Sequence, residues 1–355
     1  MRYICFLFCL GFGALISCSQ QKNEERMFSP QKVESSVAIH IAEITRAIDR
    51  NNDHPEWYLK RARLYLASNK IEAAYNDLKT ATAKDPALGE AYFQMAKILL
   101  ARQEYQEAMK MMMQAKAFNY YTPESEAVLA ETYVGLEMYD RALNHSSRAI
   151  KLRPGEAKYY VLLAKSQSGT GDTARALFNL NRALQRDSLS LPAFRELSAI
   201  YTARKQFDEA FPMVQHGIKI QPQDGFWWQQ LGQYFLNHRQ IDTALVSFNR
   251  AIELEPEYAE AFVGLAESWY RKRQYGLALE NFLKAQELGH ELNEHTRWLL
   301  ATSYEWTGNR ETARQHYIFL TQKYPENPRY RVALQRVSMP IRRPMLDSLS
   351  TRSVF

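Results

Sequence analysis

The sequence predicts an all-α protein, an α-solenoid of about eight helix-turn-helix repeats with a partial capping helix at each end. Three observations support this fold class. Small residues recur with a period of 34, with a single step of 35 before the last repeat, which is typical of stacked structural repeats. Within each period, apolar residues fall three and four positions apart, the spacing of one helix face. The composition favours helix over sheet, with only 14 Gly and 13 Pro in 355 residues.

The first 17 residues are predicted to be a signal peptide. Arg2 precedes the apolar run Tyr3–Ile16, which is too short to span a bilayer comfortably as a helix. The residues Leu-Ile-Ser-Cys at 15–18 resemble the bacterial lipobox. This resemblance implies that residues 1–17 are removed and that the mature protein begins at Cys18, with a lipid on its sulfur. An ordinary signal peptide followed by a coincidental cysteine is the alternative.

The residues after Cys18 bear on sorting. No Asp follows Cys18 that would retain a lipoprotein in the inner membrane, and Lys-Asn-Glu-Glu at 22–25 resembles the surface-export signal of Bacteroidota lipoproteins. We therefore expect an exported protein that is lipid-anchored at the outer membrane, with the periplasmic or surface leaflet left open. Cys5, Cys9 and Cys18 are the three cysteines of the sequence, so no internal disulfide and no Cys-based zinc site is expected in the mature part.

Two elements are expected between the lipid and the repeats. Residues 18–31 are polar and are predicted to form a flexible tether. Residues 32–54 are predicted to form an N-terminal capping helix, because Ile44, Ala47 and Ile48 lie in the register of the second helix of a repeat. Terminal repeats need such covers to hide apolar surface.

Eight repeats are predicted over residues 55–327. Their small residues fall in phase at two places of all eight repeats and at a third place of the first seven, with Gly217 in the one gap of the third series. Small residues are required where two helix axes come closest, since packed interiors have little spare room. The three series are Ala62, Ala96, Ala130, Ala164, Ser198, Gly232, Ala266 and Ala301; Ala74, Ala108, Ala142, Ala176, Ala210, Ala244, Ala278 and Ala313; and Ala81, Ala115, Ala149, Ala183, Ala251 and Ala285.

The best copy of the repeat carries a recognisable signature. It has Trp228, Leu231, Gly232 and Phe235 in its first half, then Ala244, Phe248, Ala251 and Pro256 in its second. This pattern resembles the tetratricopeptide repeat, a helix-turn-helix unit of 34 residues. The resemblance implies a right-handed superhelix whose first helices line a concave groove for a protein or peptide ligand. Trp228, Trp269 and Tyr160 are expected in the core.

The sequence is predicted to end with a cap and a tail. Residues 328–339 are expected to form a C-terminal capping helix with Tyr330, Leu334 and Val337 on its apolar face. Residues 340–355 contain Pro340, Pro344 and few large apolar residues, so they are predicted to be a flexible basic tail.

We expect no catalysis, no cofactor and no metal site. The elements above leave too few residues for a catalytic domain. Gly169 and Gly171 lie in an inter-helix turn with no strand before it, which does not suit a nucleotide loop. His290 and His295 flank a linker and lack a third ligand. Charges of both signs mix along each repeat, which disfavours nucleic acid as a partner although the net charge is +6.

The remaining chemistry is recognition of another protein. Residues at places two, five, nine and twelve of each repeat face the groove in the family that the repeats resemble. Aromatic and Arg side chains are the types that dominate interface energies. The candidate groove residues are Phe93, Lys97, Val161, Lys165, Arg195, Phe226, Gln229, Gln233, Tyr270 and Trp298.

The sequence thus predicts a membrane-anchored scaffold or adaptor that mediates protein–protein interactions in the cell envelope. Two alternatives stay open: a soluble periplasmic regulator that binds a peptide, and an accessory factor for cell-wall enzymes. The sequence separates the anchored scaffold from the soluble regulator only through Cys18. It does not identify the partner or the oligomeric state.

Overall fold

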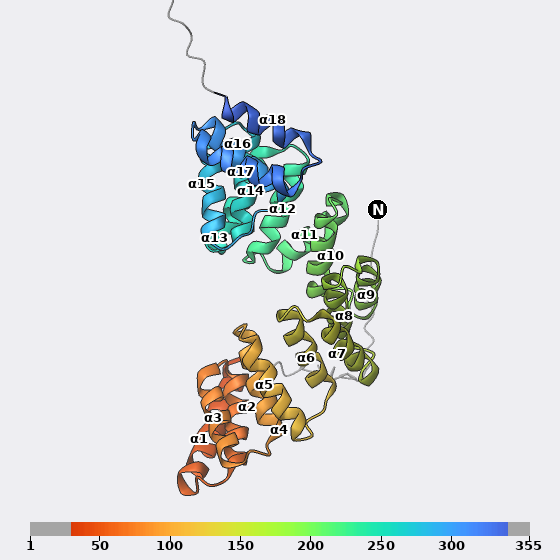
Figure 1. Ribbon diagram of the computed structural model, residues 1–355. Helices are drawn as coiled ribbons and strands as arrows, with labels where there is room; N and C mark the ends of the chain where they lie inside the picture. Colours follow the sequence, from red (N-terminus) through yellow and green to blue (C-terminus); the bar gives the residue numbers. More distant parts are fainter. Residues whose placement is uncertain (1–29, 340–355) are drawn as a thin grey trace, which may run out of the picture. The chain divides into compact units, whose positions relative to one another are not determined.

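A computed structural model describes residues 30–339, and this range contains eighteen α-helices and no β-strand. Consecutive helices pack in antiparallel pairs, as Figure 1 shows. The predicted all-α solenoid of helix-turn-helix repeats is therefore confirmed. The predicted signal peptide, Cys18, most of the tether and the basic tail lie outside the described residues. Within the described part of the protein, no helix has both the length and the apolar character needed to cross a bilayer.

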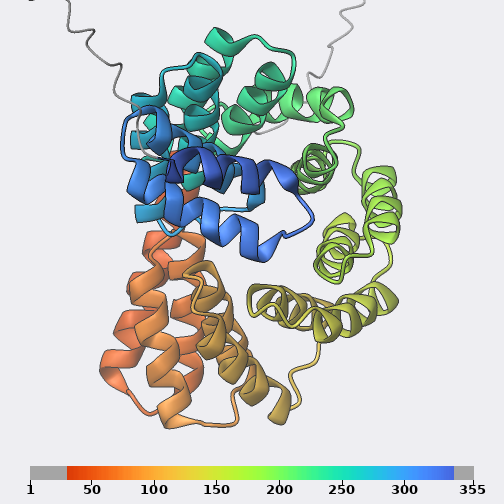
Figure 2. The ribbon, with the colours of Figure 1, turned by 45° about the horizontal axis from the view of Figure 1, so that its top comes forward.

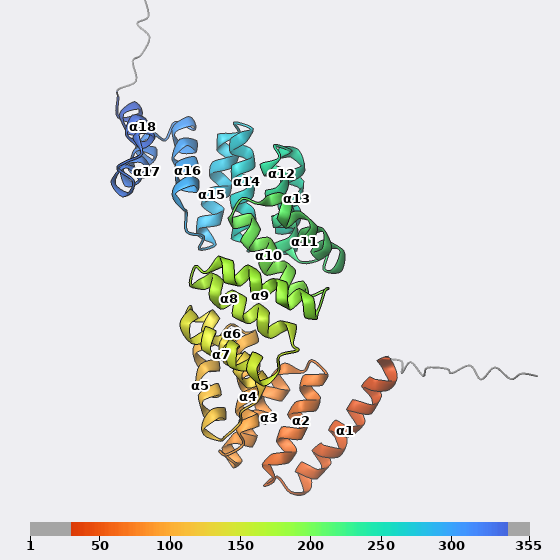
Figure 3. The same cartoon turned by 90° about the vertical axis from the view of Figure 1, so that its right-hand side faces the viewer.

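The described residues divide into two compact units, and the first of these ends at Ile98. It holds α1 (Pro30–Arg50), α2 (Pro55–Ala67), α3 (Ile71–Lys84) and the start of α4 (Gly89–Ala101). The 21-residue α1 lies beside α2 and is longer than either helix of the repeat that follows (Figure 3). It begins before the start of the capping helix expected from the sequence.

The second unit begins at Leu99 and contains the remaining helices. From α7 onward, each second helix packs on the first helix of its own repeat and on the helix that follows it. In Figure 2 the ribbon of this unit follows a curved path from the yellow helices to the blue ones. Its helices are α5 (Tyr105–Ala117), α6 (Pro123–Gly135), α7 (Tyr139–Leu152), α8 (Ala157–Gly169), α9 (Thr173–Arg186), α10 (Leu191–Ala203), α11 (Phe207–Ile220), α12 (Gly225–Asn237), α13 (Ile241–Leu254), α14 (Ala259–Arg271), α15 (Tyr275–Glu287), α16 (Glu294–Trp306), α17 (Arg310–Lys323) and α18 (Pro328–Ser338).

The periodic small residues lie at the helix contacts. Ala244, Ala251 and Ala278 are completely buried, and so are most of their counterparts in the other repeats. The exception in the third series has a physical reason: a Cβ on Gly217 would lie 2.2 Å from the ring of Trp227. The indole of Trp227 occupies the space that an alanine methyl takes elsewhere. Trp227 is fully buried, whereas Trp228, which we expected in the core, is half-buried and donates its indole N–H to the Pro222 carbonyl at 2.9 Å.

The turns inside the repeats share a backbone conformation. The residue two places after the first helix ends has a positive φ in all eight repeats. In two repeats this residue is glycine, Gly171 and Gly308, whereas Glu137, Lys205 and Arg273 are among the residues that adopt the same conformation elsewhere. In the first seven repeats the next N–H then donates to a carbonyl of the last helical turn, which satisfies a backbone group that the helix end leaves unpaired.

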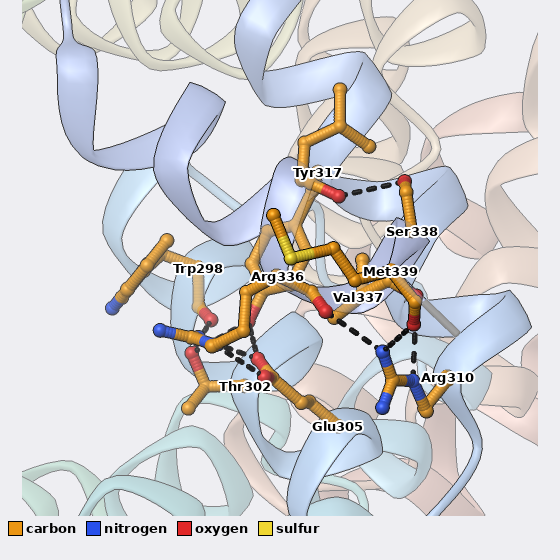
Figure 4. A network of polar contacts seen from close by, with 10 residues as sticks. Trp298, Thr302, Glu305, Arg310, Tyr317, Arg336, Val337, Ser338 and Met339 are labelled. Atoms are coloured by element: carbon orange, nitrogen blue, oxygen red, sulfur yellow. Dashed lines mark hydrogen bonds and ion pairs between the residues drawn. The ribbon is translucent and has the colours of Figure 1, made fainter. Parts of the chain in front are cut away.

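A polar network closes the C-terminal end. Arg336 of α18 donates to both carboxylate oxygens of Glu305 at 2.6 and 2.7 Å, and the Tyr317 hydroxyl donates to the same carboxylate at 2.8 Å. Arg310, at the start of α17, donates to the carbonyls of Arg336 at 2.7 Å and Met339 at 2.8 Å. Figure 4 shows these groups converging between α16, α17 and α18. The cap is therefore held by hydrogen bonds as well as by the buried side chains of Tyr330 and Val337.

Candidate functional site

The second unit has a distinct inner face. The first helices α6, α8, α10, α12, α14 and α16 each pack on the next first helix in the series. The second helices pack on first helices and, within the described residues, make no comparable contact with one another. Because the first helices approach more closely, they lie on the inside of the curve. We call the surface of these six helices the inner face.

An arginine and an aromatic ring meet at the middle of the inner face. The guanidinium of Arg195 on α10 lies 4.1 Å above the ring centroid of Phe226 on α12 and forms an ion pair with Asp224. The Asp224 carboxylate also caps α12, since it accepts from the Phe226 N–H at 3.0 Å. Stacking and the ion pair together hold the charged fork of Arg195 in one place.

Further polar contacts join neighbouring first helices. Lys165 Nζ on α8 lies 3.1 Å from a carboxylate oxygen of Glu196 on α10. The Thr202 hydroxyl of α10 donates to the amide oxygen Oε1 of Gln230 on α12 at 2.6 Å. These side chains are partly buried rather than free in water, so each contact helps to fix the position of one repeat against the next.

The inner face carries an embedded acid near its C-terminal end. Burial raises the pKa of Glu267 on α14, against the opposing influence of Arg271 and Lys205. Burial lowers the pKa of His295 on α16, and the positive charges of Lys205, Arg271 and Arg329 lower it further. Lys205 belongs to a turn two repeats before Glu267, so the curvature brings cations from separate repeats close to one acid. Glu267 lies 4.0 Å from His295.

Next to this acid is a cavity of about 320 Å³. It lies between the first turns of α16 and α18, so two helix N-termini border it. Trp298, Arg329 and Tyr330 form one wall, with the guanidinium of Arg329 at 4.3 Å from the Trp298 ring centroid. Asn293, Glu294 and His295 complete the lining.

The structure places the predicted groove residues in three situations. Phe93, Val161, Gln229 and Trp298 are buried and present little surface. Lys97 is exposed, and its ammonium lies 5.7 Å from the Phe93 ring in the first unit. The half-buried residues of the second unit are Lys165, Arg195, Phe226, Gln233 and Tyr270. The structure brings Arg195 and Phe226 into contact, and Trp298 is the predicted residue that lines the C-terminal cavity.

Sequence reasoning did not nominate several residues of this surface. Glu196 and Asp224 pair with nominated cations, and Glu267 stands at place nine of its repeat. A signal was available for these acids, since opposite charges at neighbouring inner-face places indicate contacts between repeats. For Lys205 and Arg329 no such signal existed, because one lies in a turn and the other in the cap. In residues 30–339 no group of three or more His, Cys, Asp or Glu side chains is placed to hold a metal ion.

Comparison with known proteins gives a partial family match. A family model described as tetratricopeptide repeat matches residues 59–116 and 230–290. A human protein, protein O-mannosyl-transferase TMTC1, is 23% identical over 137 residues, which is 39% of this chain. The matched segment is 15% of that protein, so the chain spans a small part of this relative.

Solved structures resemble the protein more completely. The APC/C hetero-tetramer Cut9–Hcn1 includes a polypeptide that gives a TM-score of 0.64 at 13% identity, over 87% of this protein and 59% of that one. A tetratricopeptide repeat protein from Parabacteroides merdae gives a TM-score of 0.54 at 16% identity, over 70% and 98%. PilF from Pseudomonas aeruginosa gives 0.52 at 18% identity, over 60% and 97%. At these identities the similarity is one of fold.

Proposed function

We propose that this protein, which contains tetratricopeptide repeats, is a non-catalytic scaffold that is anchored to a bacterial outer membrane through lipidated Cys18 and binds a partner protein on its inner face. Tetratricopeptide-repeat proteins generally mediate protein–protein interactions, and this repeat scaffold is typically non-catalytic. The anchor rests on the Leu-Ile-Ser-Cys segment at 15–18. Two or three acyl chains would give firm attachment where one is marginal.

The observation that carries the binding proposal is the inner face itself. Six consecutive first helices present a continuous surface, on which Arg195, Phe226, Gln233 and Tyr270 remain partly exposed. Arginine and aromatic side chains held in fixed positions lose little entropy on binding, so they make effective anchors for a partner. An extended or helical segment of another protein is the occupant that suits a surface of this length.

A site-specific crosslinking experiment tests the binding face. A photoreactive amino acid is introduced at Gln233 on the inner face, and in a matched control at Gln185, an exposed residue of the second helix α9. Both full-length proteins are expressed in the native host and irradiated. We expect a discrete crosslinked envelope protein from position 233 and none from position 185. Equal crosslinking from both positions, or none from either, would overturn the inner face as the binding surface.

The anchor is tested separately by comparing wild type with Cys18→Ala. We expect the wild type in the membrane fraction and the variant in the soluble periplasmic fraction. If both proteins are soluble and crosslink to the same partner, the lipid anchor is wrong and the soluble peptide-binding regulator replaces it. If the captured partner is a cell-wall hydrolase, the accessory-factor alternative is favoured.

A further inference from the structure

The cavity beside Trp298 has the electrostatic setting of an anion site. It lies where α16 and α18 both begin, and the first N–H groups of a helix carry partial positive charge. Asn293 and Asn327 cap these two helices through their side-chain oxygens, which accept from Thr296 N–H at 3.0 Å and Arg329 N–H at 3.2 Å. A helix N-terminus alone does not make an anion site, so the proposal depends on the side chains around the cavity.

The buried indole of Trp298 supplies an unused donor. Trp298 is 7% exposed and lines the cavity, and its Nε1–H has no hydrogen-bond partner within the described residues. In Figure 4 the indole nitrogen points away from Thr302 and Glu305. Buried donors are almost always satisfied, and an indole N–H can only donate. The partner that the Trp298 N–H lacks is therefore a hydrogen-bond acceptor.

Arg329 supplies a free charged fork at the same place. Its guanidinium stacks 4.3 Å from the Trp298 ring centroid, is exposed, and has no carboxylate partner among residues 30–339. Because this side chain lies at the surface, it can shift toward an incoming anion. The planar fork offers two parallel N–H groups, which match the two oxygens of a carboxylate.

The charge balance around the cavity favours an anion. The acid that lines it, Glu294, already accepts a hydrogen bond from the Tyr330 hydroxyl at 2.5 Å. Burial and this contact with Glu294 raise the pKa of Tyr330 to about 12, so the hydroxyl keeps its proton. Lys205 and Arg271 act on His295, which also lines the cavity, and on the neighbouring acid Glu267. Together with Arg329, these cations outnumber the two acids Glu267 and Glu294.

We propose that this cavity binds a carboxylate of the partner protein, with the Trp298 Nε1–H and the Arg329 guanidinium as its donors. The proposal rests on the proposed function, because it names the chemistry of the partner that the inner face would hold. The carboxylate can come from the C-terminus of a polypeptide or from an Asp or Glu residue, and both sources present the same two oxygens to the same donors.

The indole proton itself reports on the proposed bond. The full-length protein in detergent is labelled with ¹⁵N at its six tryptophan indoles, and Trp298→Phe identifies the Trp298 signal. Three probes are titrated: N-acetylglycine for a terminal carboxylate, N-acetylaspartate diamide for an aspartyl carboxylate, and neutral N-acetylglycinamide. We expect a saturable downfield shift of the Trp298 signal with at least one carboxylate and about tenfold weaker binding of the neutral amide. The carboxylate probe that binds more tightly identifies the source.

Two arginine variants complete the test. Arg329→Gln should lower the affinity for the carboxylate probe at least about tenfold. Arg331→Gln, which changes an exposed neighbour on the same helix, should leave that affinity within about twofold of the wild type. The proposal is wrong if the Trp298 signal stays fixed with every probe, if the neutral amide binds equally well, or if Arg329→Gln has no effect. If one of these results is found while the photoreactive residue at position 233 still crosslinks to a partner, only the carboxylate site is wrong. If position 233 gives no crosslinked partner, the proposed function itself is wrong.

Discussion

At the scale of single residues, the packing of the helices depends on glycines that lie against large aromatic rings. Gly217 replaces an alanine of the periodic series, and the indole of Trp227 fills the vacated volume at 2.2 Å from where a Cβ would lie. Phe248 has the same relation to Gly232 and Gly264, whose added Cβ atoms would lie 2.5 and 2.3 Å from its ring. Each of these three glycines therefore accompanies a large aromatic neighbour, and the pair acts as one packing unit.

Gly217→Ala should destabilise the protein by about 1–3 kcal/mol, because the fully buried Trp227 has no space into which to move. The matched control is Gly276→Ala in α15, where an added Cβ meets nothing within 4 Å. That control should be neutral or stabilising by up to about 1 kcal/mol, since alanine is the better helix former. Urea unfolding of both variants measures the difference, and equal free energies of unfolding would contradict this packing.

The half-buried His316 should make the protein less stable in mild acid. Burial, and then the charge of Arg297, lower the pKa of its imidazole below the ordinary value of 6.5. The unfolded protein therefore binds a proton at a higher pH than the folded protein, and stability falls as the pH drops through 6.5. His316→Phe keeps a ring against Tyr304, which stacks on His316 at 5.7 Å, and removes this titration.

Urea unfolding of wild type and His316→Phe at pH 7.5, 6.5 and 5.5 would measure the effect, these pH values being chosen to bracket about 6.5. We expect the free energy of unfolding of the wild type to fall more steeply with acid than that of the variant. Parallel curves for the two proteins would show that His316 is not responsible.

At the scale of helices and turns, the two helices of each repeat are joined by a turn that requires a positive φ, which few of the residues found there favour. Six of the eight intra-repeat turns place a non-glycine residue at positive φ, among them Glu137, Lys205 and Arg239. Each accepts this strain because the following N–H then reaches a helix carbonyl, as from Gln206 to Tyr201 at 2.8 Å and from Met138 to Tyr133 at 2.9 Å.

Gly308→Ala should therefore cost about 1–2 kcal/mol, because the φ of Gly308 is 90° and alanine carries a Cβ there. Gly155→Ala is the control, since its added Cβ has no neighbour within 4 Å and its φ is not positive. Thermal melts of the two variants give the comparison. A loss of stability in the control as large as that in Gly308→Ala would mean that conformation at the turn is not the cause.

The helical repeat could be predicted from the sequence because its small residues are in phase, and Ala62, Ala96 and Ala130 are all completely buried. The positive-φ turns could not, because glutamate, lysine and arginine give no local sign of that conformation. The places of each repeat that lie on the inner face could also be predicted, but the exposure of each side chain there could not. Val161 and Gln229 stand at predicted groove places and are buried, since the length of a neighbouring side chain decides whether a position is covered.

At the scale of the whole molecule, the protein is a series of neighbour contacts. From α6 onward, first helices of adjacent repeats touch, and from α7 onward each second helix joins its own repeat to the helix that follows. Stability is then approximately a sum of repeat and interface contributions. The site depends on this arrangement, because Lys205, Glu267 and His295 come from repeats five, seven and eight. No pattern along the sequence relates these three residues, which is why the embedded acid was not foreseen.

Arg310→Met should release the C-terminal cap without unfolding the distant repeats. The substitution removes the donors to the Arg336, Val337 and Met339 carbonyls, which would then lose their partners at the end of α18. Hydrogen exchange should become about tenfold faster or more in α18, with α8 and α9 unchanged. Faster exchange throughout the second unit would show that the cap controls the whole stack.

Residues that contact one another are close in sequence, and this also affects how the protein folds. The hydrogen bond from Tyr330 to Glu294 spans 36 residues, and the other side-chain hydrogen bonds described above are no longer. Topologies with such low contact order fold rapidly, because little loop-closure entropy is lost before contacts form. Within the second unit, each repeat can therefore fold onto the one before it as soon as its own residues are available, so folding can proceed in the order in which the repeats are synthesised.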